Sequence, residues 1–476
     1  MNWKPDRKDK KAIYKQLAEY IEHGIIDGTF PLDNPLPSER KLAEEFNLNR
    51  STVVAAYDEL ESNGLIERKR GSGTVISKDI WGLTKKRIPS WNRYVEAGSF
   101  QPSLPVVQRL RKETEDQKLI NLASGELSPD LFPLEYMGKI TSTRTFVGNL
   151  GYDHPQGNQI LRSTIAKHVK KYKDIEIDPS SILITSGAQQ ALHLVVQCLL
   201  KPGDAVALED PSYHYGLSIF KSAGVRTYLL PVDKDGINPD HLRKLHQKHR
   251  IRMLFLNPAH QNPTGAFLSV ERRKQILELS SEMGIPVIED DPYSLTSFSG
   301  EKTSPLKSMD VNGNVLYISS LSKIVASGLR IGWIIGPKPV IERIADAKQQ
   351  VDFGHASFTQ WIANEFLDSE YFDVHLNNLI SKLMQRRDQI VTSLRSTLED
   401  HVGFHIPQGG IHLWCELKKE YSEAKLLEAA IKRGVIFVPG LTMGEKKGFV
   451  RFTFARENEK NIERGIKRFS EAFFSL

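Results

Sequence analysis

Apolar residues near the start of the chain recur with the period of an α-helix. Ile13, Leu17, Ile21 and Ile25 are spaced by four residues, and this spacing predicts an amphipathic helix. Three prolines within residues 31–37 then force a loop, because proline lacks a backbone donor and clashes with the preceding helical turn. The pattern therefore predicts one helix followed by a loop.

Two more helices and a hairpin are predicted after this loop. Ser38 stands where the N-cap of a short helix is expected, and that helix runs through Phe46. A third helix with one apolar face follows a short turn and extends to about Asn63. Residues 65–68 and 74–76 predict two short strands joined by a glycine-containing turn. The predicted order over residues 1–77 is helix, helix, helix, hairpin.

The periodicity weakens between residues 78 and 117. Pro89, Pro102 and Pro105 interrupt this stretch, and aromatic residues are scattered through it. We interpret 78–117 as a linker, part of which packs through its aromatic side chains.

Short apolar runs alternate with helical segments in the rest of the chain, residues 118–476. This alternation predicts an α/β domain with a largely parallel sheet. The apolar runs are Ser181–Thr185, Ala205–Glu209, Arg252–Asn257, Pro286–Glu289, Val315–Ser319 and Ile331–Ile335. From about Pro339, long helical patterns and strands near Leu413–Glu416 and Val450–Phe454 predict a smaller α+β subdomain. The chain is therefore expected to be multidomain, with a small α+β unit followed by a large α/β unit.

The composition indicates the class of protein and the compartment in which it works. Of the 476 residues 40% are hydrophobic and 26% are charged, as in ordinary globular proteins. Only two cysteines are present, Cys198 and Cys415, which disfavours a disulfide scaffold or a cysteine-rich zinc site and favours a reducing compartment. The N-terminus has no apolar signal-peptide region, and no apolar stretch is long enough to span a bilayer. We expect a cytoplasmic protein with no membrane partner and no metal site.

The N-terminal block has the spacing of a helix-turn-helix that reads DNA. Arginine, lysine and small polar side chains stand where such a motif meets phosphates or guanine edges. The candidates are Ser38, Arg40, Arg50, Ser51 and Thr52 on the helices, and Arg68, Lys69, Arg70 and Gly73 on the hairpin. Residues 1–77 hold 12 basic and 13 acidic residues, a net charge of −1, so only local placement supports DNA binding. Periodicity alone leaves a small helical protein-interaction domain as an equal alternative.

The C-terminal block contains the groups that pyridoxal phosphate requires. This cofactor needs a lysine amine, donors around its phosphate, a carboxylate at its pyridine nitrogen and an arginine for the carboxylate of an amino acid. Lys323 follows an apolar strand, with Ser320, Ser322 and Arg330 at short offsets. A single Ser-x-x-Lys would be weak, whereas this whole set after a strand is a much stronger signal.

Three other motifs fit the same cofactor but are ambiguous when taken singly. Gly187, Ala188 and Gln189 follow a strand and open a helix, where backbone N–H groups can bind phosphate, although an ordinary strand-to-helix turn looks the same. The acids of 289–291 allow a pyridine-nitrogen partner, a magnesium site or a solvated loop. The loop 257–265 is rich in turn-forming residues and could be a plain turn.

Residues 1–77 resemble the winged helix-turn-helix of the GntR regulator family. The resemblance is carried by Leu36-Pro37-Ser38-Glu39-Arg40-Lys41-Leu42-Ala43, by Asn49-Arg50-Ser51-Thr52-Val53 and by Leu60-Glu61-Ser62-Asn63-Gly64-Leu65-Ile66. It implies that Arg40, Arg50, Ser51, Thr52 and the wing around Gly73 face a double-stranded DNA operator. Val54 stands where some relatives have a basic side chain, so the operator sequence stays open.

Residues 118–476 resemble the fold type I aminotransferases, most of all the kynurenine/2-aminoadipate branch. The resemblance implies pyridoxal 5'-phosphate as cofactor, with Lys323 as the catalytic Schiff-base lysine and Asp290 as the partner of the pyridine nitrogen. It also implies that Asn262 and Tyr293 hold the ring hydroxyl and that Tyr213 stacks on the ring.

The same resemblance assigns the phosphate, the substrate and the partner subunit. Phosphate binding falls to Ser320, Ser322, Arg330 and the turn formed by Gly187, Ala188 and Gln189. Arg451 takes the substrate carboxylate. Tyr152 reaches the phosphate of the partner subunit, which requires a homodimer.

A GntR-type reader joined to an aminotransferase-like domain is the layout of the MocR regulators, which this chain resembles over nearly its full length. The resemblance implies a regulator that responds to pyridoxal phosphate or to an amino compound or amino acid effector that reacts with it. A catalytically active aminotransferase that carries a DNA-binding domain is the main alternative, because no catalytic motif position is missing. A scaffold that keeps the fold without chemistry is the third interpretation. The effector, the operator and the direction of regulation cannot be derived from the sequence.

Overall fold

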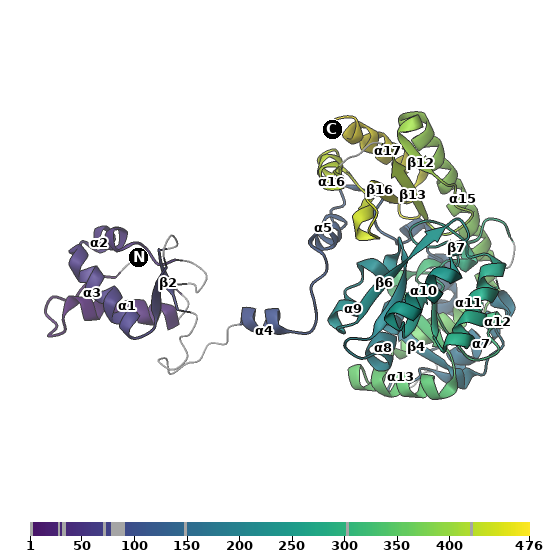
Figure 1. The fold of residues 1–476 in the computed structure, drawn as a ribbon, viewed down its shortest axis with the longest axis horizontal. Helices are drawn as coiled ribbons and strands as arrows, with labels where there is room; N and C mark the ends of the chain where they lie inside the picture. The colour runs from purple at the N-terminus through teal and green to yellow at the C-terminus, as the bar shows by residue number, and fades with distance from the viewer. Residues whose placement is uncertain are drawn as a thin grey trace. The chain divides into compact units, whose positions relative to one another are not determined.

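The computed structural model of the chain contains two compact units, Met1–Gly98 and Ser99–Leu476 (Figure 1). It describes all residues except 1–2, 27–28, 31–34, 70–72, 78–90, 147–149, 301–303 and 419–421. Residues 78–90, the first third of the interval that we interpreted as a linker, lie outside the described residues, as does Arg70. No helix among the described residues is long and apolar enough to cross a membrane.

The first unit is a three-helix bundle followed by a two-stranded hairpin. Its elements are α1 (Ile13–Ile26), α2 (Glu39–Phe46), α3 (Arg50–Ser62), β1 (Ile66–Lys69), β2 (Gly73–Ile76) and the short helix α4 (Trp91–Ala97). The predicted apolar faces form the core, in which Leu17, Ile21, Val53 and Tyr57 are fully buried. The strands β1 and β2 pair antiparallel, and the backbone of Leu36 donates to Thr74, which ties the hairpin to the loop before α2.

The second unit is built on a mixed sheet of eight strands in the order β4-β11-β10-β9-β8-β5-β6-β7. The strands are β4 (Ile182–Ser186), β5 (Ala205–Asp210), β6 (Arg226–Asp233), β7 (Gly236–Ile237), β8 (Met253–Leu256), β9 (Val287–Asp290), β10 (Val315–Ser320) and β11 (Ile331–Ile335). The five strands from β10 to β6 run parallel, whereas β11 is antiparallel to both of its neighbours. The predicted α/β class is confirmed, with β11 and β7 making the sheet mixed.

Helices cover both faces of this sheet, as its two-sided apolar strands require. On β5, Val206 and Leu208 belong to the core under α8 (Gly187–Leu199) and α13 (Lys338–Val351), whereas Ala205 and Ala207 belong to the opposite core. That opposite core is closed by α10 (Pro239–His249), α11 (Val270–Met283) and α12 (Leu306–Met309) (Figure 1). The remaining helices of the large subdomain are α6 (Leu134–Thr143), α7 (Gln159–Lys173), α9 (Ile219–Ser222) and α14 (Ser357–Leu367).

The second unit also contains a smaller, antiparallel sheet. Its order is β12 (Val402–Phe404), β13 (His412–Leu417), β16 (Phe449–Thr453) and β15 (Val438–Pro439). The helices α15 (Tyr371–Leu398), α16 (Glu423–Lys432) and α17 (Glu459–Phe473) accompany it, and β14 (Val435–Ile436) pairs with β3 (Ile120–Asn121). The predicted smaller α+β subdomain is confirmed, with β13 and β16 at the predicted places.

Helix α5 (Pro105–Glu113) lies within the interval that we interpreted as a linker, 78–117. It belongs to the second unit, which begins at Ser99, and it buries Leu110 in the main core cluster. Pro105 opens this helix at its first position, where a missing N–H costs nothing. The proline that suggested a break therefore starts a helix instead.

Candidate functional site

The predicted DNA-reading residues of the first unit gather around the N-termini of α2 and α3. Ser38 caps α2, its hydroxyl accepting from the backbone N–H of Lys41 at 3.3 Å. Asn47 ends α2 in the left-handed conformation, and Asn49 precedes α3. The first turn of α3 presents Arg50, whose side chain is 71% exposed. The turn between the helices is therefore short, as a helix-turn-helix needs.

Glu39 joins this surface to the hairpin. Its carboxylate lies 3.4 Å from a guanidinium nitrogen of Arg50 and 3.4 Å from one of Arg68. Arg68 is also held by Glu61 at 2.5 Å and by Asp58 at 2.7 Å. The sequence analysis missed Glu39 as a positioning residue, although it stands beside Ser38 in the quoted motif.

The other candidates of this unit lie on the surface. Arg40 pairs with Glu44 on its own helix, and Lys69 pairs with Glu67 on β1. Ser51 and Gly73 are exposed and Thr52 is half-buried. Arg68 is the candidate whose charge is most strongly neutralised within the protein, and the role of every one of these residues in DNA contact stays a prediction.

In the second unit, a cavity of about 510 Å³ opens at the carboxyl ends of the parallel strands. This edge of an α/β sheet is where ligands are usually bound, because the loops that follow the strands converge there. The predicted cofactor and substrate residues Gly187, Ala188, Gln189, Tyr213, Asn262, Asp290, Tyr293, Ser320, Ser322, Lys323, Arg330 and Arg451 all line it. The fold thus brings together groups that are up to 264 positions apart in sequence, from Gly187 beside the large sheet to Arg451 on the small one.

Asp290 at the end of β9 presents a carboxylate to the cavity with one oxygen unsatisfied. Its Oδ2 lies 3.3 Å from Nε2 of His214, whereas its buried Oδ1 has no hydrogen-bond partner among the described residues. Asn257 fixes the strand end by donating its side-chain amide to the carbonyl of Asp290 at 2.7 Å. A buried carboxylate oxygen is costly to leave unpaired, so this one is suited to a protonated ring nitrogen of a ligand.

Lys323 follows β10 and projects its amine into the same cavity. Its Nζ donates to the carbonyl of Gly125. Burial lowers the pKa of Lys323 to about 8, with Glu126 opposing this shift and Arg451 adding to it. A lysine with a lowered pKa is neutral and nucleophilic for a larger share of the time near neutral pH.

An anion cradle lies beside this amine. The N-terminus of α8 offers backbone N–H groups that have no partner within the helix. Arg330 lies against it, donating to the carbonyls of Ser186 at 2.8 Å and Ser327 at 3.1 Å. Gly187 has a φ of +75°, and a Cβ there would come within 2.8 Å of the Arg330 guanidinium. Glycine is therefore required for the close approach of backbone and guanidinium.

On the opposite wall, Arg451 and Tyr293 form a buried polar network. Arg451 donates to Oδ1 of Asn262 at 3.2 Å and to the carbonyl of Ala123, and its Nε has no partner among the described residues. Burial lowers the pKa of Arg451 to about 10, although Tyr293 and Tyr213 oppose this shift. The hydroxyl of Tyr293 lies 3.4 Å from the amide of Asn262. An arginine with a free buried donor is poised for a carboxylate.

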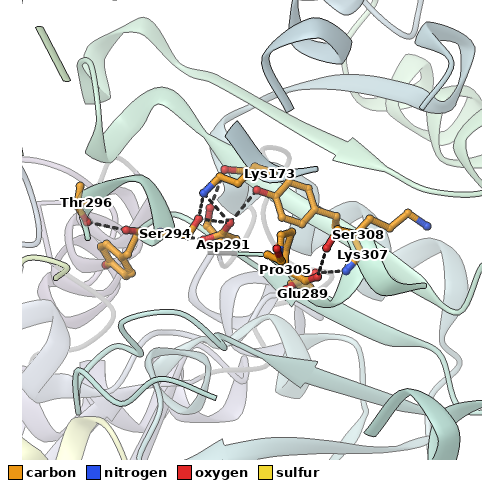
Figure 2. Close-up of polar contacts among 12 residues, drawn as sticks. Lys173, Glu289, Asp291, Ser294, Thr296, Pro305, Lys307 and Ser308 are labelled. Atoms are coloured by element: carbon orange, nitrogen blue, oxygen red, sulfur yellow. Dashed lines mark hydrogen bonds and ion pairs between the residues drawn. The ribbon is translucent and has the colours of Figure 1, made fainter. Parts of the chain in front are cut away.

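The acids on either side of Asp290 have a structural role. Asp291 lies beside the ammonium of buried Lys173 (Figure 2), with 3.5 Å between Oδ2 and Nζ. The hydroxyl of Tyr317 donates to Asp291 at 2.8 Å. Glu289 accepts from the backbone N–H groups of Leu306 at 2.8 Å and Lys307 at 2.9 Å. Because side chains alternate along a strand, only Asp290 lines the cavity. Of the alternatives for this motif, the geometry favours a ligand-facing carboxylate flanked by two structural acids.

Tyr152 is the predicted cofactor residue that does not line the cavity. Its side chain is 82% exposed and lies beside the ring of Phe353, with the ring centroids 5.5 Å apart. Such exposure is compatible with a role toward a partner subunit, and that role stays a prediction.

Several lining residues were missed from the sequence. His214 follows Tyr213 directly, and Asn257 opens the quoted loop, yet neither was assigned a role. His412 on β13 does not line the cavity but supports it from behind, with its Nε2 3.2 Å from the Tyr293 hydroxyl. Arg111 of α5 lines the cavity from within the interval interpreted as a linker. These contacts join distant segments, so only adjacency to a motif could have marked His214 and Asn257.

Comparison with known proteins gives the same two parts. Residues 13–76 match "Bacterial regulatory proteins, gntR family", and residues 117–469 match "Aminotransferase class I and II". The uncharacterized HTH-type transcriptional regulator YisV of Bacillus subtilis is 38% identical over 98% of this chain and 97% of its own length.

Two of the relatives are enzymes that match about four fifths of the chain. The aromatic-amino-acid aminotransferase 1 of Thermococcus litoralis is 34% identical over 80% of this chain and 94% of its own length. The kynurenine aminotransferase of Pyrococcus horikoshii, solved as a crystal structure, is 31% identical with a TM-score of 0.75 and covers 81% of this chain and 98% of its own.

Fold, cavity and relatives together define a DNA-binding transcriptional regulator whose second part is an aminotransferase-like domain. The chain belongs to the MocR-type branch of the GntR family, in which both parts occur in one polypeptide. The predicted fold class and the predicted regulator function are confirmed. The aminotransferase family implies pyridoxal phosphate as the cofactor of the second part.

Proposed function

We propose that this protein is a homodimeric, cytoplasmic transcription regulator that binds pyridoxal 5'-phosphate in the 510 Å³ cavity and reports the cofactor, or an amino compound that reacts with it, to DNA. The observation that carries the proposal is the convergence on one cavity of a lysine, a carboxylate with an unpaired buried oxygen and an anion cradle. These are the three polar demands of this cofactor, and the residues present fit them.

Each residue has a defined task toward the cofactor. Lys323 would hold it covalently through its amine, and Asp290 would keep a proton on the pyridine nitrogen. The first turn of α8, with Ser320, Ser322 and Arg330, would hold the phosphate. The bound cofactor supplies an electrophilic carbon for primary amines and an electron sink for their bonds.

The substrate side of the cavity sets the class of effector. Arg451 is buried with a free Nε, and its planar guanidinium matches a carboxylate. We expect an amino acid or a related amino carboxylate to bind between Arg451 and Lys323. Binding there bridges the small subdomain, which carries Arg451 on β16, and the large subdomain, which carries Lys323. A ligand that favours one arrangement of these subdomains can bias the equilibrium of the whole regulator.

A visible absorption spectrum of the purified protein tests the proposal. After free pyridoxal phosphate has been removed, wild type should keep an imine band, and Lys323→Ala should lack it. A panel of amino acids and amines should then shift this band for one effector class, without release of keto acid. If no imine band remains after incubation with excess pyridoxal phosphate and its removal, the cofactor assignment fails.

An active aminotransferase remains the second candidate function. It is favoured by the completeness of the lining, because Lys323 can carry a proton as well as hold the cofactor and Arg451 keeps the clamp for a substrate carboxylate. Conversion to the pyridoxamine form with stoichiometric keto acid in the same experiment would establish it. A scaffold without chemistry would bind DNA identically in wild type and in Lys323→Ala at every cofactor concentration.

A further inference from the structure

A second cavity in the C-terminal unit, of about 1270 Å³, shares no lining residue with the first. Its walls come from the β6–β7 turn, the loop 260–267, the start of α11, the segment 404–408 and strands β13 and β16. His260 lines this second cavity, while Asn262, two residues further on, lines the first. The two cavities therefore contact the same short segment of chain.

Arg273 places a buried guanidinium in the wall of the second cavity. Its side chain is 1% exposed, and it donates through Nε to the carbonyl of Leu268 at 2.8 Å and through Nη1 to that of Ser304. Its buried Nη2 has no hydrogen-bond partner among the described residues. Leaving a buried charged donor unpaired is among the more costly defects of a folded protein. The unused N–H groups therefore call for an acceptor, and an anionic oxygen matches both their geometry and their charge.

His260 adds a second unsatisfied group to the same wall. Its side chain is 4% exposed, and neither ring nitrogen has a partner among the described residues. The residue adopts a φ of +51°, and its ring lies so close to Gly409 that a Cβ there would be 2.3 Å from Nε2. Burial lowers the pKa of His260 to about 4, so the imidazole is neutral near pH 7 and offers one donor and one acceptor.

Aromatic side chains complete the lining. The Arg273 guanidinium lies over the face of Phe267, 4.5 Å from the ring centroid. The centroids of the Phe267 and His260 rings are 5.7 Å apart. Across the small sheet, Trp414 and Phe449 stack with centroids 5.1 Å apart and planes within 5°. The cavity thus combines a cationic donor, a neutral imidazole and flat apolar surfaces, which is the usual make-up of a small-molecule site.

Three acidic residues line the cavity, Asp210, Asp233 and Glu416, and the first two have other partners. Asp233 forms an ion pair with Arg272 at 2.5 Å. Asp210 accepts from the backbone N–H of Glu445 at 3.2 Å. Neither is paired with Arg273 in any ion pair of the described residues. Glu289 and Asp291 lie close enough to interact with the Arg273 charge, but neither lines this cavity or forms an ion pair with Arg273 among the described residues, so the unused Nη2 donor stays suited to an anion.

We propose that this second cavity binds an aromatic carboxylic acid, with the carboxylate on Arg273 and His260 and the ring against the aromatic lining. The ligand is distinct from pyridoxal phosphate and from the amino compound expected in the first cavity. The chemistry that the site recognises is a planar apolar body with one carboxylate, and no amino group is required.

Binding of 4-fluorophenylacetate to the pyridoxal-phosphate-treated full chain, followed by ligand-observed ¹⁹F NMR, tests this proposal. We expect saturable binding to wild type and binding at least about tenfold weaker to Arg273→Met, because the charge-assisted hydrogen bonds are lost. Lys274→Met is the matched control, since Lys274 is the next residue on α11, is exposed and does not line the cavity. It should bind as wild type does.

Further probes separate the second cavity from the first and from non-specific binding. Arg451→Met should leave binding of the probe unchanged, and 4-fluorophenylacetamide should bind at least about tenfold more weakly than the acid. His260→Asn, which tolerates a left-handed backbone, gives a second test should Arg273→Met fail to fold. Equal binding to wild type, Arg273→Met and His260→Asn, loss of binding in Arg451→Met, or no saturation would overturn the proposal.

Discussion

Asp290 and Asp291 are neighbours in sequence with different surroundings, and the difference defines their roles. Asp290 faces the cofactor cavity with a free oxygen, whereas Asp291 is buried against Lys173. Burial raises the pKa of Asp291, but Lys173 and the hydrogen bonds from Ser294 and Tyr317 outweigh this and leave the pKa below its usual value. Replacement by asparagine should therefore lower the folding stability at Asp291 and weaken cofactor binding at Asp290.

We predict that Asp291→Asn destabilises the C-terminal unit by about 3 kcal/mol, because it leaves the buried ammonium of Lys173 without its counter-charge. Asp290→Asn should leave the melting temperature of the cofactor-free protein nearly unchanged, while it weakens the cofactor band and alters its position. Thermal unfolding monitored by circular dichroism, beside visible spectra, measures both effects. Equal melting temperatures for wild type and Asp291→Asn would contradict this division of roles.

The pKa of Lys323 determines how the rate of cofactor attachment should depend on pH. With a folded pKa of about 8, its amine changes from mostly protonated to mostly neutral as the pH rises through 8, well below the range of an exposed lysine. The rate at which cofactor-free protein develops its visible band should rise with pH and level off above about 9. Stopped-flow absorbance across pH 6.5–10 checks this, and a rate still rising steeply at pH 10 would show an unperturbed lysine.

At the scale of single residues, the sequence sufficed for groups within strong local motifs and not for groups brought in by tertiary contacts. Lys323, Arg330 and Gly187 follow strands at recognisable offsets, and the structure places them around one cavity. His214 reaches Asp290 across 76 positions, a contact that no local pattern encodes. No local pattern marked Arg273 or His260 as site residues either, because the burial of an arginine and a histidine beside a cavity depends on the tertiary structure.

Helix α3 is the element on which DNA reading depends. Arg50 at its first turn is largely exposed, and its interaction with Glu39 is long, so the guanidinium is available to DNA. Arg68 on β1, by contrast, is held by three carboxylates. The two arginines were equivalent candidates in the sequence, and the structure separates them.

We predict that Arg50→Ala weakens DNA binding by about 1–3 kcal/mol if the side chain reads a base. If the side chain contacts a phosphate instead, the slope of log affinity against log salt concentration should become shallower by about one. Lys15→Ala on α1 removes one exposed charge from the same unit and should change neither quantity appreciably. Fluorescence anisotropy over a salt series measures both. Affinity and slope unchanged in Arg50→Ala would exclude the N-terminus of α3 from the interface.

Elements were predictable where their apolar pattern was strong. The strands of the central sheet with buried runs, such as β8 and β10, lie within two residues of their predicted places. Strand β6 was missed, because it lies next to the edge of the sheet and its half-exposed residues show no continuous apolar run. Helix α5 was missed as well, because a proline at its first position was taken for a break.

At the scale of the whole molecule, the account requires two chains, with Tyr152 of each completing the site of the other. We predict that Lys323→Ala and Tyr152→Ala are each defective in cofactor binding, and that co-refolding the two variants recovers part of the wild-type band. A mixed dimer holds one site with both residues intact, whereas a monomer can hold none. No recovery on mixing, with refolded wild type as the positive control, would contradict a shared site.

The central claim is that the state of the cofactor cavity sets the affinity of the protein for DNA. The most direct measurement is the dissociation constant for a duplex that the protein itself has selected from a random library. It should be determined without cofactor, with pyridoxal phosphate, and with pyridoxal phosphate plus each amino compound that shifts the visible band. We expect a change of several-fold between these states in wild type and none in Lys323→Ala. A single dissociation constant for wild type in every state, with the cofactor demonstrably bound, would contradict it.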